Sequence, residues 1–440
     1  MEKTPPFETP LGRAAALITN PALPVDAMMR ILRAVPGAPG EVEYLRAFSD
    51  ELSARLATHE DPALRMLLGR APGVTGPQRA LLVADPDPAV RKQAAYGPDP
   101  TDFFRLPRSP MPAEAYRVVL ADPEVAVRLR AALSYHTPDD VRAALTRDPE
   151  ARVRREALEE LERPPRDVLA ALLDDPDEQV RVVAERRSQP RDTAKDLREA
   201  ADPDPWIRAR AARDGHLPAD VVARLVADPD NRVRVAVSMR PELTEEQRAA
   251  IDYHIDPSDR IQPPTWVTDA TDPDIVRRCV YSAHVGLRRA AAYNPKLPPD
   301  LVAVLAEDED FIVRLILTES HPEPPAAVLL DVVLRSEFVT RFDGLRHPNF
   351  PRTGLTHLAD SSDEVARGLV ALDRDAPDEL IARLARDESL IVRRWMARHA
   401  RLDPAVLAAF LDDPQTVKSA LNNPHLPPEY IEATLADAGI

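Results

Sequence analysis

Short clusters of apolar residues recur along the chain at a period of 26 or 27 residues, separated by polar residues and prolines. The clearest marker of each period is a hydrophobic residue followed by arginine, which we call the Arg position. One interval of 37 residues indicates an insertion of about ten residues, and one of 54 spans two periods. The Arg positions are Arg65, Arg91, Arg128, Arg154, Arg181, Arg208, Arg234, Arg288, Arg314, Arg341, Arg367 and Arg393, with Val417 in the last place.

The residues around each Arg position predict two short helices per repeat. Six residues upstream lies Asp followed by Pro, as in Asp148-Pro149, and we expect a helix to begin there with Asp as the cap. Downstream, a breaker such as Asn294-Pro295 is followed by Leu297-Pro298-Pro299. The second of these prolines is expected to open another helix, whose apolar residues follow a three-to-four spacing.

Helices of two or three turns are unstable alone, so each must bury its apolar stripe against the next repeat. The sequence therefore predicts an all-α solenoid of about fourteen two-helix repeats, including one degenerate repeat. The expected organisation is capping helices over residues 1–56, a repeat array over 57–248 with an insertion at 99–111, the degenerate repeat at 249–284, and a second array with a C-terminal cap over 285–440.

From Arg288 to Leu305 the sequence resembles the leucine-rich repeat variant family, and the pattern covers roughly residues 57–436. A half-repeat at Ala14 to Leu32 looks similar and is expected to form the N-terminal cap. The resemblance implies a right-handed superhelix related to HEAT and armadillo solenoids, which mostly bind other macromolecules. One family architecture carries an N-terminal iron–sulfur module. This chain has no cysteine in that region, so the module is not expected here.

Composition narrows the class of protein further. The chain has 440 residues, 44% hydrophobic, with 47 Pro, 13 Gly and a single cysteine, Cys279, which excludes an internal disulfide. The start of the sequence lacks signal-peptide features and no apolar run could span a membrane, so a soluble cytoplasmic protein is expected. The net charge of −16 disfavours binding to nucleic acid or anionic membranes, and favours a partner with a basic patch.

Catalytic motifs are not found: the sequence contains no phosphate-binding glycine loop, no His-Glu-x-x-His and no Gly-x-Ser-x-Gly. We therefore expect a non-catalytic protein with no cofactor and no metal. Most of the ten histidines fall in the turn after the first helix, where a structural role is favoured. They include His136, His216, His321, His347, His399 and His425.

The regular arginines allow two interpretations. Each guanidinium could pair with the Asp of its own or a neighbouring repeat, or the row could follow a phosphate backbone. The matching Asp period favours the structural ladder. Its members are Arg91, Arg128, Arg154, Arg181, Arg208, Arg234, Arg288, Arg314 and Arg393.

Departures from the repeat supply most of the candidate partner-binding residues. The insertion holds adjacent phenylalanines beside arginines, a composition typical of binding hot spots, although it could also fold back onto the stack. The degenerate repeat mixes His, Asp, Cys and aromatic residues, which favours a packing role, with a ligand groove or a metal site as alternatives. The candidates are Phe103, Phe104, Arg105 and Arg108 in the insertion, Tyr253 and Trp266 in the degenerate repeat, and Trp206, which lies in a regular repeat two residues before the Arg position and near an expected helix start.

Two main functions remain open. The favoured one is a non-catalytic scaffold that binds a protein partner along the solenoid surface. The alternative is a nucleic-acid-binding solenoid similar to the HEAT-like alkylpurine DNA glycosylases, with an Arg-lined groove and Trp266 acting beside Asp269 or Asp272. A small-molecule or metal site in the degenerate repeat is a third possibility.

Overall fold

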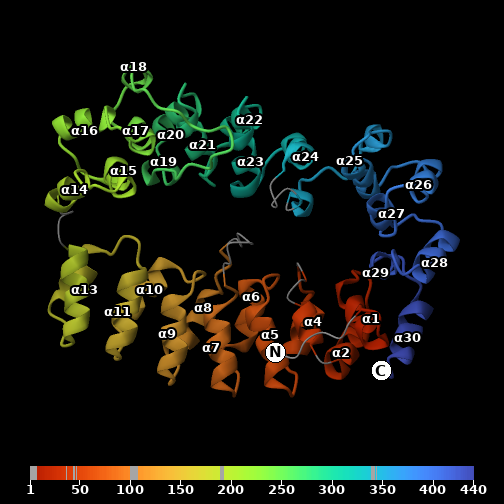
Figure 1. Cartoon of the computed structure of the whole chain (residues 1–440). Coiled ribbons are helices and arrows are strands. Elements are labelled where there is room, and N and C mark those ends of the chain that lie inside the picture. The colour runs from red at the N-terminus through yellow and green to blue at the C-terminus, as the bar shows by residue number, and fades with distance from the viewer. Residues whose placement is uncertain are drawn as a thin grey trace. The chain divides into compact units, whose positions relative to one another are not determined.

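A computed structural model describes residues 7–35, 37–42, 45, 47–99, 108–188, 193–337, 342 and 344–440. This part of the chain is all-α, with about 30 short helices and a few 3₁₀ turns. Along several stretches a helix packs on the helix two places further on, as α7 (Pro88–Tyr96) does on α9 (Val125–Leu133) (Figure 1). That order of packing is consistent with a repeat array.

The chain divides into two compact units, and the first contains both ends of the sequence: Met1–Gln189, Ala359–Ala371 and Ala376–Ile440. Besides α7 and α9, its helices are α1 (Pro10–Ala16), η1 (Leu17–Thr19), α2 (Val25–Ala34), α3 (Ala38–Val42), α4 (Asp50–Ala57), α5 (Pro62–Arg70), α6 (Gly76–Arg79), η2 (Ala80–Leu82), α8 (Ala113–Leu120), α10 (Asp139–Leu145), α11 (Ala151–Glu160), α12 (Arg166–Leu173), α13 (Glu178–Ser188), α25 (Glu364–Leu369), α26 (Asp378–Leu384), α27 (Leu390–Met396), α28 (Pro404–Asp412), α29 (Val417–Ala420) and α30 (Pro428–Asp437).

The second unit consists of Pro190–Leu358 and Leu372–Asp375, and η6 (Val370–Leu372) lies at its border. Its helices are α14 (Thr193–Glu199), α15 (Pro205–Asp214), α16 (Ala219–Val226), α17 (Asn231–Ser238), α18 (Glu245–Ala249), α19 (Thr265–Thr268), α20 (Pro273–Val280), α21 (Val285–Ala292), α22 (Pro299–Ala306), α23 (Phe311–Ser320), α24 (Ala326–Arg335), η4 (Gly344–Arg346) and η5 (Thr356–Leu358).

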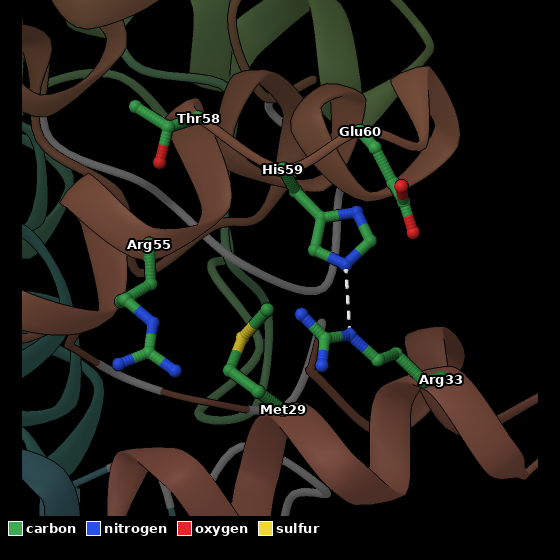
Figure 2. Close-up of a pocket in the computed structure, with 6 residues that line it drawn as sticks. All are labelled: Met29, Arg33, Arg55, Thr58, His59 and Glu60. Atoms are coloured by element: carbon green, nitrogen blue, oxygen red, sulfur yellow. Dashed lines mark hydrogen bonds between the residues drawn. The ribbon is translucent and has the colours of Figure 1, made fainter.

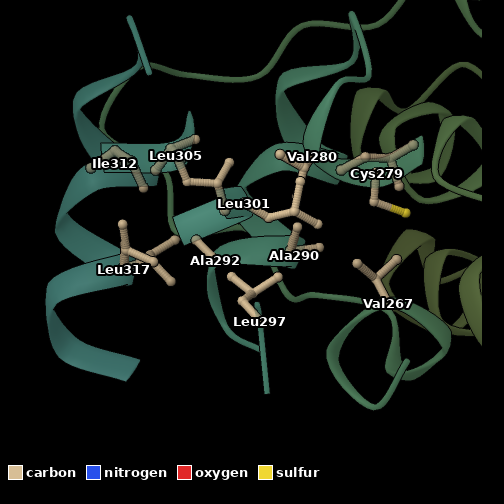
Figure 3. Packing of buried hydrophobic residues seen from close by; sticks show 14 of the residues in the cluster. Val267, Cys279, Val280, Ala290, Ala292, Leu297, Leu301, Leu305, Ile312 and Leu317 are labelled. Atoms are coloured by element: carbon tan, nitrogen blue, oxygen red, sulfur yellow. The ribbon is translucent and has the colours of Figure 1, made fainter. Parts of the chain in front are cut away.

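The core is built from small aliphatic side chains in thin layers. In the largest cluster of the second unit, Ala290 and Leu305 are fully buried between neighbouring helices, and Val280 and Ile312 are nearly so (Figure 3). Since each layer is only one helix pair thick, every repeat depends on its neighbours for burial. No helix in the described ranges is long and apolar enough to cross a membrane.

The first helix of a repeat begins two residues later than the Asp-Pro pattern predicted. In α7 the cap is Asp87, whose side chain accepts from Ala89 N–H at 2.8 Å, and Pro88 is the first helical residue. Asp85 of the Asp-Pro pair instead accepts the N–H of Asp87, also at 2.8 Å. The prediction was wrong because the Asp of the pair holds the turn that presents the cap, and is not itself the cap.

The second helix begins as expected. Pro299 is the first residue of α22, and Pro428 is the first residue of α30. Proline is tolerated there because its missing N–H would have no intrahelical partner.

Arginines at the Arg position connect successive repeats. In the first unit, Arg154 Nε and Nη2 donate to the two carboxylate oxygens of Asp175 at 2.7 Å, while Nη1 donates to the carbonyl of Asp148 at 2.8 Å. Each guanidinium of this kind therefore binds the turn of its own repeat and the Asp of the next. The same arrangement joins Arg65 to Asp85, Arg91 to Asp122, Arg128 to Asp148, Arg208 to Asp228, Arg288 to Asp308 and Arg367 to Asp387.

Four Arg positions differ from this arrangement. Arg181, Arg234 and Arg393 also donate to the carbonyl six residues upstream, and Arg314 reaches Asp331, which lies inside α24. Arg341 lies outside the described residues.

A second connection, which we call the staple, follows the first helix. The Asn423 side chain accepts the N–H of His425 at 2.8 Å and donates to the carbonyls of Ala397 and His399, in the preceding repeat, at 2.9 and 3.0 Å. Asn294 makes the same pair of contacts with Lys296 N–H and Ala270 O, at 2.9 and 2.8 Å. His321, His347 and Ser134 occupy equivalent places and bond to Leu297, Pro322 and Tyr96, respectively.

Arg154→Ala should lower the free energy of unfolding by about 3 kcal/mol, because it leaves the buried carboxylate of Asp175 without its cation. The two side chains are only 11% and 5% exposed. Urea unfolding monitored by circular dichroism measures the loss. Arg152→Ala, at an exposed position of the same helix, is the control and should change stability little. Equal effects of the two substitutions would contradict a stabilising role for the ion pair.

The stability difference between wild type and Arg154→Ala should also depend on pH. The ion pair with Arg154 lowers the pKa of Asp175 against the opposing effect of burial. The stabilisation is therefore complete above the unfolded pKa of about 3.9 and is lost as pH falls through the lower native pKa. The stability difference between wild type and Arg154→Ala should shrink over that range, and a constant difference down to pH 2 would be inconsistent with this origin.

Candidate functional site

The insertion begins and ends on a rigid base formed around His136. This imidazole, only 2% exposed, accepts the N–H of Ser109 at Nδ1 and bonds through Nε2 to the carbonyl of Pro98, both at 3.1 Å. One side chain thus joins the two ends of the insertion. Burial, with the nearby charge of Arg79, lowers the pKa of His136 to about 4, so the ring is neutral at physiological pH.

Two further residues close this base. Arg79 is fully buried and donates to the carbonyls of Ala94 and Ser109, and desolvation lowers its pKa to about 10. Gly97 ends α7 with φ +80°, and a Cβ there would lie 2.5 Å from Arg79 Nη1 and 2.8 Å from His136 Cδ2. Both the backbone angle and the close approach require glycine at this point.

A groove of about 300 Å³ lies beside the base of the insertion. The Arg108 guanidinium stacks 5.1 Å from the ring centre of Tyr135, which is 37% exposed. Arg130 stacks in the same way on Tyr96, at 4.6 Å. Carboxylates complete the lining, which includes Asp99, Glu160 and Glu162. Arg142 also lines the groove, which therefore combines aromatic rings with three carboxylates and two guanidinium groups, an excess of acidic groups that suits a basic side chain.

The predicted partner-binding residues fall into separate places. Phe103, Phe104 and Arg105 lie outside the described residues, between the two anchored ends of the insertion. Arg108 lines the groove. Trp206, in the second unit, is 67% exposed near the start of α15, and Arg232 stacks on it at 4.7 Å.

The two candidates in the degenerate repeat are partly buried. Trp266 donates its indole N–H to the carbonyl of Met239 at 3.1 Å and packs on the largest core cluster of that unit. Tyr253 stacks on His284 with ring centres 4.5 Å apart. Of the carboxylates proposed to act with Trp266, Asp272 caps α20 by accepting Asp274 N–H at 2.9 Å. These contacts favour packing over ligand binding.

The loop before Trp266 is held by another buried arginine. Arg289 of α21 pairs with both oxygens of Asp310 at 3.0 and 2.7 Å, and donates to the carbonyls of Asp256 and Pro257 at 3.1 and 3.3 Å. Nearby, burial raises the pKa of Cys279 to about 11, so its sulfur stays a thiol. No group of three or more His, Cys, Asp or Glu side chains placed to hold a metal occurs among the residues that the structure describes.

A second cavity, of about 420 Å³, lies in the first unit between α2 and α4 (Figure 2). His59 stands there six residues before Arg65, where most repeats have Asp. Its Nδ1 accepts Asp61 N–H at 3.0 Å and its Nε2 faces Arg33 Nε at 3.2 Å, but a neutral imidazole has only one acceptor nitrogen.

Comparisons with known proteins assign no family. No family model matches the chain, and no curated protein matches it. Among solved structures, an engineered protein from a structural genomics consortium aligns over 97% of this chain and 93% of its own length, at 15% identity and a TM-score of 0.13. That score is too low to indicate a shared fold. The helices and their order of packing make the described part of the chain an all-helical repetitive protein.

His136→Gln should make stability less dependent on pH between 6.5 and 4. The native pKa of His136 is lowered, so its contribution is complete above the unfolded value of about 6.5 and is lost as pH falls toward 4. Removing the ring should reduce proton uptake on unfolding by about one proton in this range. Urea unfolding at pH 7, 6, 5 and 4.5 gives the slope of the free energy of unfolding against pH. The exposed His425→Gln is the control, and equal slopes in the two variants would contradict the assignment.

Proposed function

We propose that this chain is a non-catalytic scaffold that binds a protein partner at the base of the insertion and along the adjoining repeats. The observation that carries the proposal is the clamp formed by His136 and Arg79, which fixes both ends of the insertion beside an aromatic and acidic groove. Loops projecting from a rigid framework are common binding elements. Phe103 and Phe104, in the intervening segment, supply the apolar groups from which we expect an anchor.

The chemistry of the groove suggests a basic partner segment. Glu160, Glu162 and Asp99 contribute carboxylates, and Tyr96 and Tyr135 contribute rings on which guanidinium groups already stack within this chain. A partner arginine could replace Arg108 on Tyr135 and pair with Glu162, which Arg108 approaches at 3.7 Å. The net charge of −16 would favour the encounter.

We also propose the finer architecture indicated by the sequence: a right-handed superhelix of about fourteen repeats, divergent from but related to the leucine-rich repeat variant family. Support comes from the arginine ion pairs and the staple, which recur with the sequence period. In such an array a partner contacts several successive repeats.

The nucleic-acid alternative receives less support. In seven of the described Arg positions the guanidinium bonds both to a carboxylate of the next repeat and to a carbonyl of its own. Those donors are occupied, and binding phosphate would require breaking the ion pairs.

Affinity capture from native lysate tests the proposal with three baits: wild type, the double substitution Phe103→Ala with Phe104→Ala, and Tyr281→Ala as a control at an exposed tyrosine elsewhere. We expect a stoichiometric protein that survives nuclease, is retained by the control, and is weakened by at least about tenfold in the double variant.

Two results would count against the scaffold. Nuclease-sensitive capture dominated by DNA or RNA would favour the alternative. A protein retained equally by all three baits would place the binding surface away from the insertion. The comparison requires that both variants keep the melting temperature of wild type. A lower melting temperature in the double variant would indicate that Phe103 and Phe104 pack in the core and do not bind a partner.

A further inference from the structure

The N-terminal half-repeat makes a staple, but to the other end of the chain. Asn20, only 3% exposed, accepts the N–H of Ala22 at 2.7 Å through its side-chain oxygen. Its amide nitrogen donates to the carbonyls of Leu421 and Asn423 at 2.6 and 3.1 Å. Asn423 makes the same contacts with His425, Ala397 and His399.

Other contacts surround this staple within the first unit. Helix α1 packs against α30, and these two helices lie side by side in Figure 1. Thr19 Oγ1 donates to Asn422 Oδ1 at 2.7 Å. Arg30 pairs with both oxygens of Glu432, at 3.1 and 3.3 Å, and donates to the carbonyl of Ile440 at 2.8 Å. Leu17, Ile18 and Leu435 are fully buried.

The N-terminal half-repeat therefore lies where a repeat following the last one would lie. The sequence predicted separate caps for the two ends, whereas the first and last repeats cover each other. Terminal repeats need such cover, because an uncapped end exposes the apolar face that internal repeats bury. Here that need is met by a contact between segments about 400 residues apart, with no chain connection across it.

We propose that the C-terminal repeat, residues 417–440, is a docking surface for the half-repeat at residues 9–32, and that it accepts the same half-repeat from a second copy of this chain when the internal contact opens. The occupant is identified by the structure, since the chain's own half-repeat already fits the surface. The internal contact is intramolecular and does not depend on protein concentration, whereas exchange between two copies is favoured as concentration rises, so the internal contact prevails at low protein concentration. Exchange of this segment between copies would give a swapped assembly.

Charge reversal across the interface provides the test. In each single variant, Arg30→Glu or Glu432→Arg, positions 30 and 432 carry like charges and repel each other within the chain. In a swapped dimer that contains one copy of each variant, both contacts between these positions join opposite charges. We expect the backbone amides of residues 417–437 to undergo hydrogen–deuterium exchange at least fivefold faster in each single variant than in wild type. An equimolar mixture at high concentration should give a dimer containing one copy of each, measured by native mass spectrometry.

Two controls separate this interpretation from general destabilisation. The chain carrying both Arg30→Glu and Glu432→Arg should return to wild-type exchange rates and remain a monomer at low concentration. Arg277→Glu disrupts an internal ion pair with Asp300 of comparable exposure, 54% and 59% against 41% and 62%, and should leave exchange at residues 417–437 unchanged. A mixture that yields no mixed dimer overturns the proposal, as do single variants whose terminal amides exchange at the wild-type rate.

Discussion

The structure depends on the guanidinium that binds two repeats at once. Arg154 fastens its own turn at the carbonyl of Asp148 and reaches the carboxylate of Asp175, which in turn accepts the N–H of Asp177 before the next helix. Arginine suits this role because its planar fork matches a carboxylate and leaves one further nitrogen for a carbonyl. The hydrogen bonds of the arginine therefore set the position of each repeat relative to the next, while the small aliphatic side chains between the helices form the core.

Where the repeat departs from its pattern, buried polar groups add further connections, although Arg91 still makes the regular ion pair with Asp122 across the insertion. His136 and Arg79 hold the insertion, and Arg289 holds the loop of the degenerate repeat by its backbone carbonyls. His136 and Arg79 bond to main-chain atoms of the insertion's ends, and Arg289 combines main-chain carbonyls with the carboxylate of Asp310, which fixes the path of segments that could not be held by apolar packing alone. The insertion thereby leaves the array at a defined place, beside a groove whose lining differs from the surrounding surface.

The features that recur with the repeat could be predicted from the sequence, whereas the contacts that occur only once could not. The matching spacing of Arg and Asp indicated ion pairs, and Pro299 marked a helix start correctly. The start of the first helix was misplaced by two residues, because Asp85 and Asp87 both precede a proline and only geometry distinguishes the turn from the cap. His136 was expected to be structural, but its link to Pro98 and Ser109 follows from no spacing rule.

The contact between the ends was missed for a similar reason. The segment from Asn20 to Pro24 could be recognised as half a repeat, but no local pattern states which surface it will cover. Its partners, Leu421 and Asn423, are fixed only when the whole chain has folded. Long-range contacts of this kind also carry the largest loop-closure cost, so they are expected to form late in folding.

Docking of the ends also bears on how such a sequence can change in evolution. In an open repeat array each unit touches only its neighbours, so duplication or loss of one unit alters length and little else. In this chain the segments that meet at the ends carry a further constraint, because a deletion or insertion between Asn20 and the start of α2, or between Leu421 and the start of α30, would shift Asn20 relative to its acceptors at Leu421 and Asn423. Changes of length should therefore be less tolerated in these two segments than substitutions at their exposed positions.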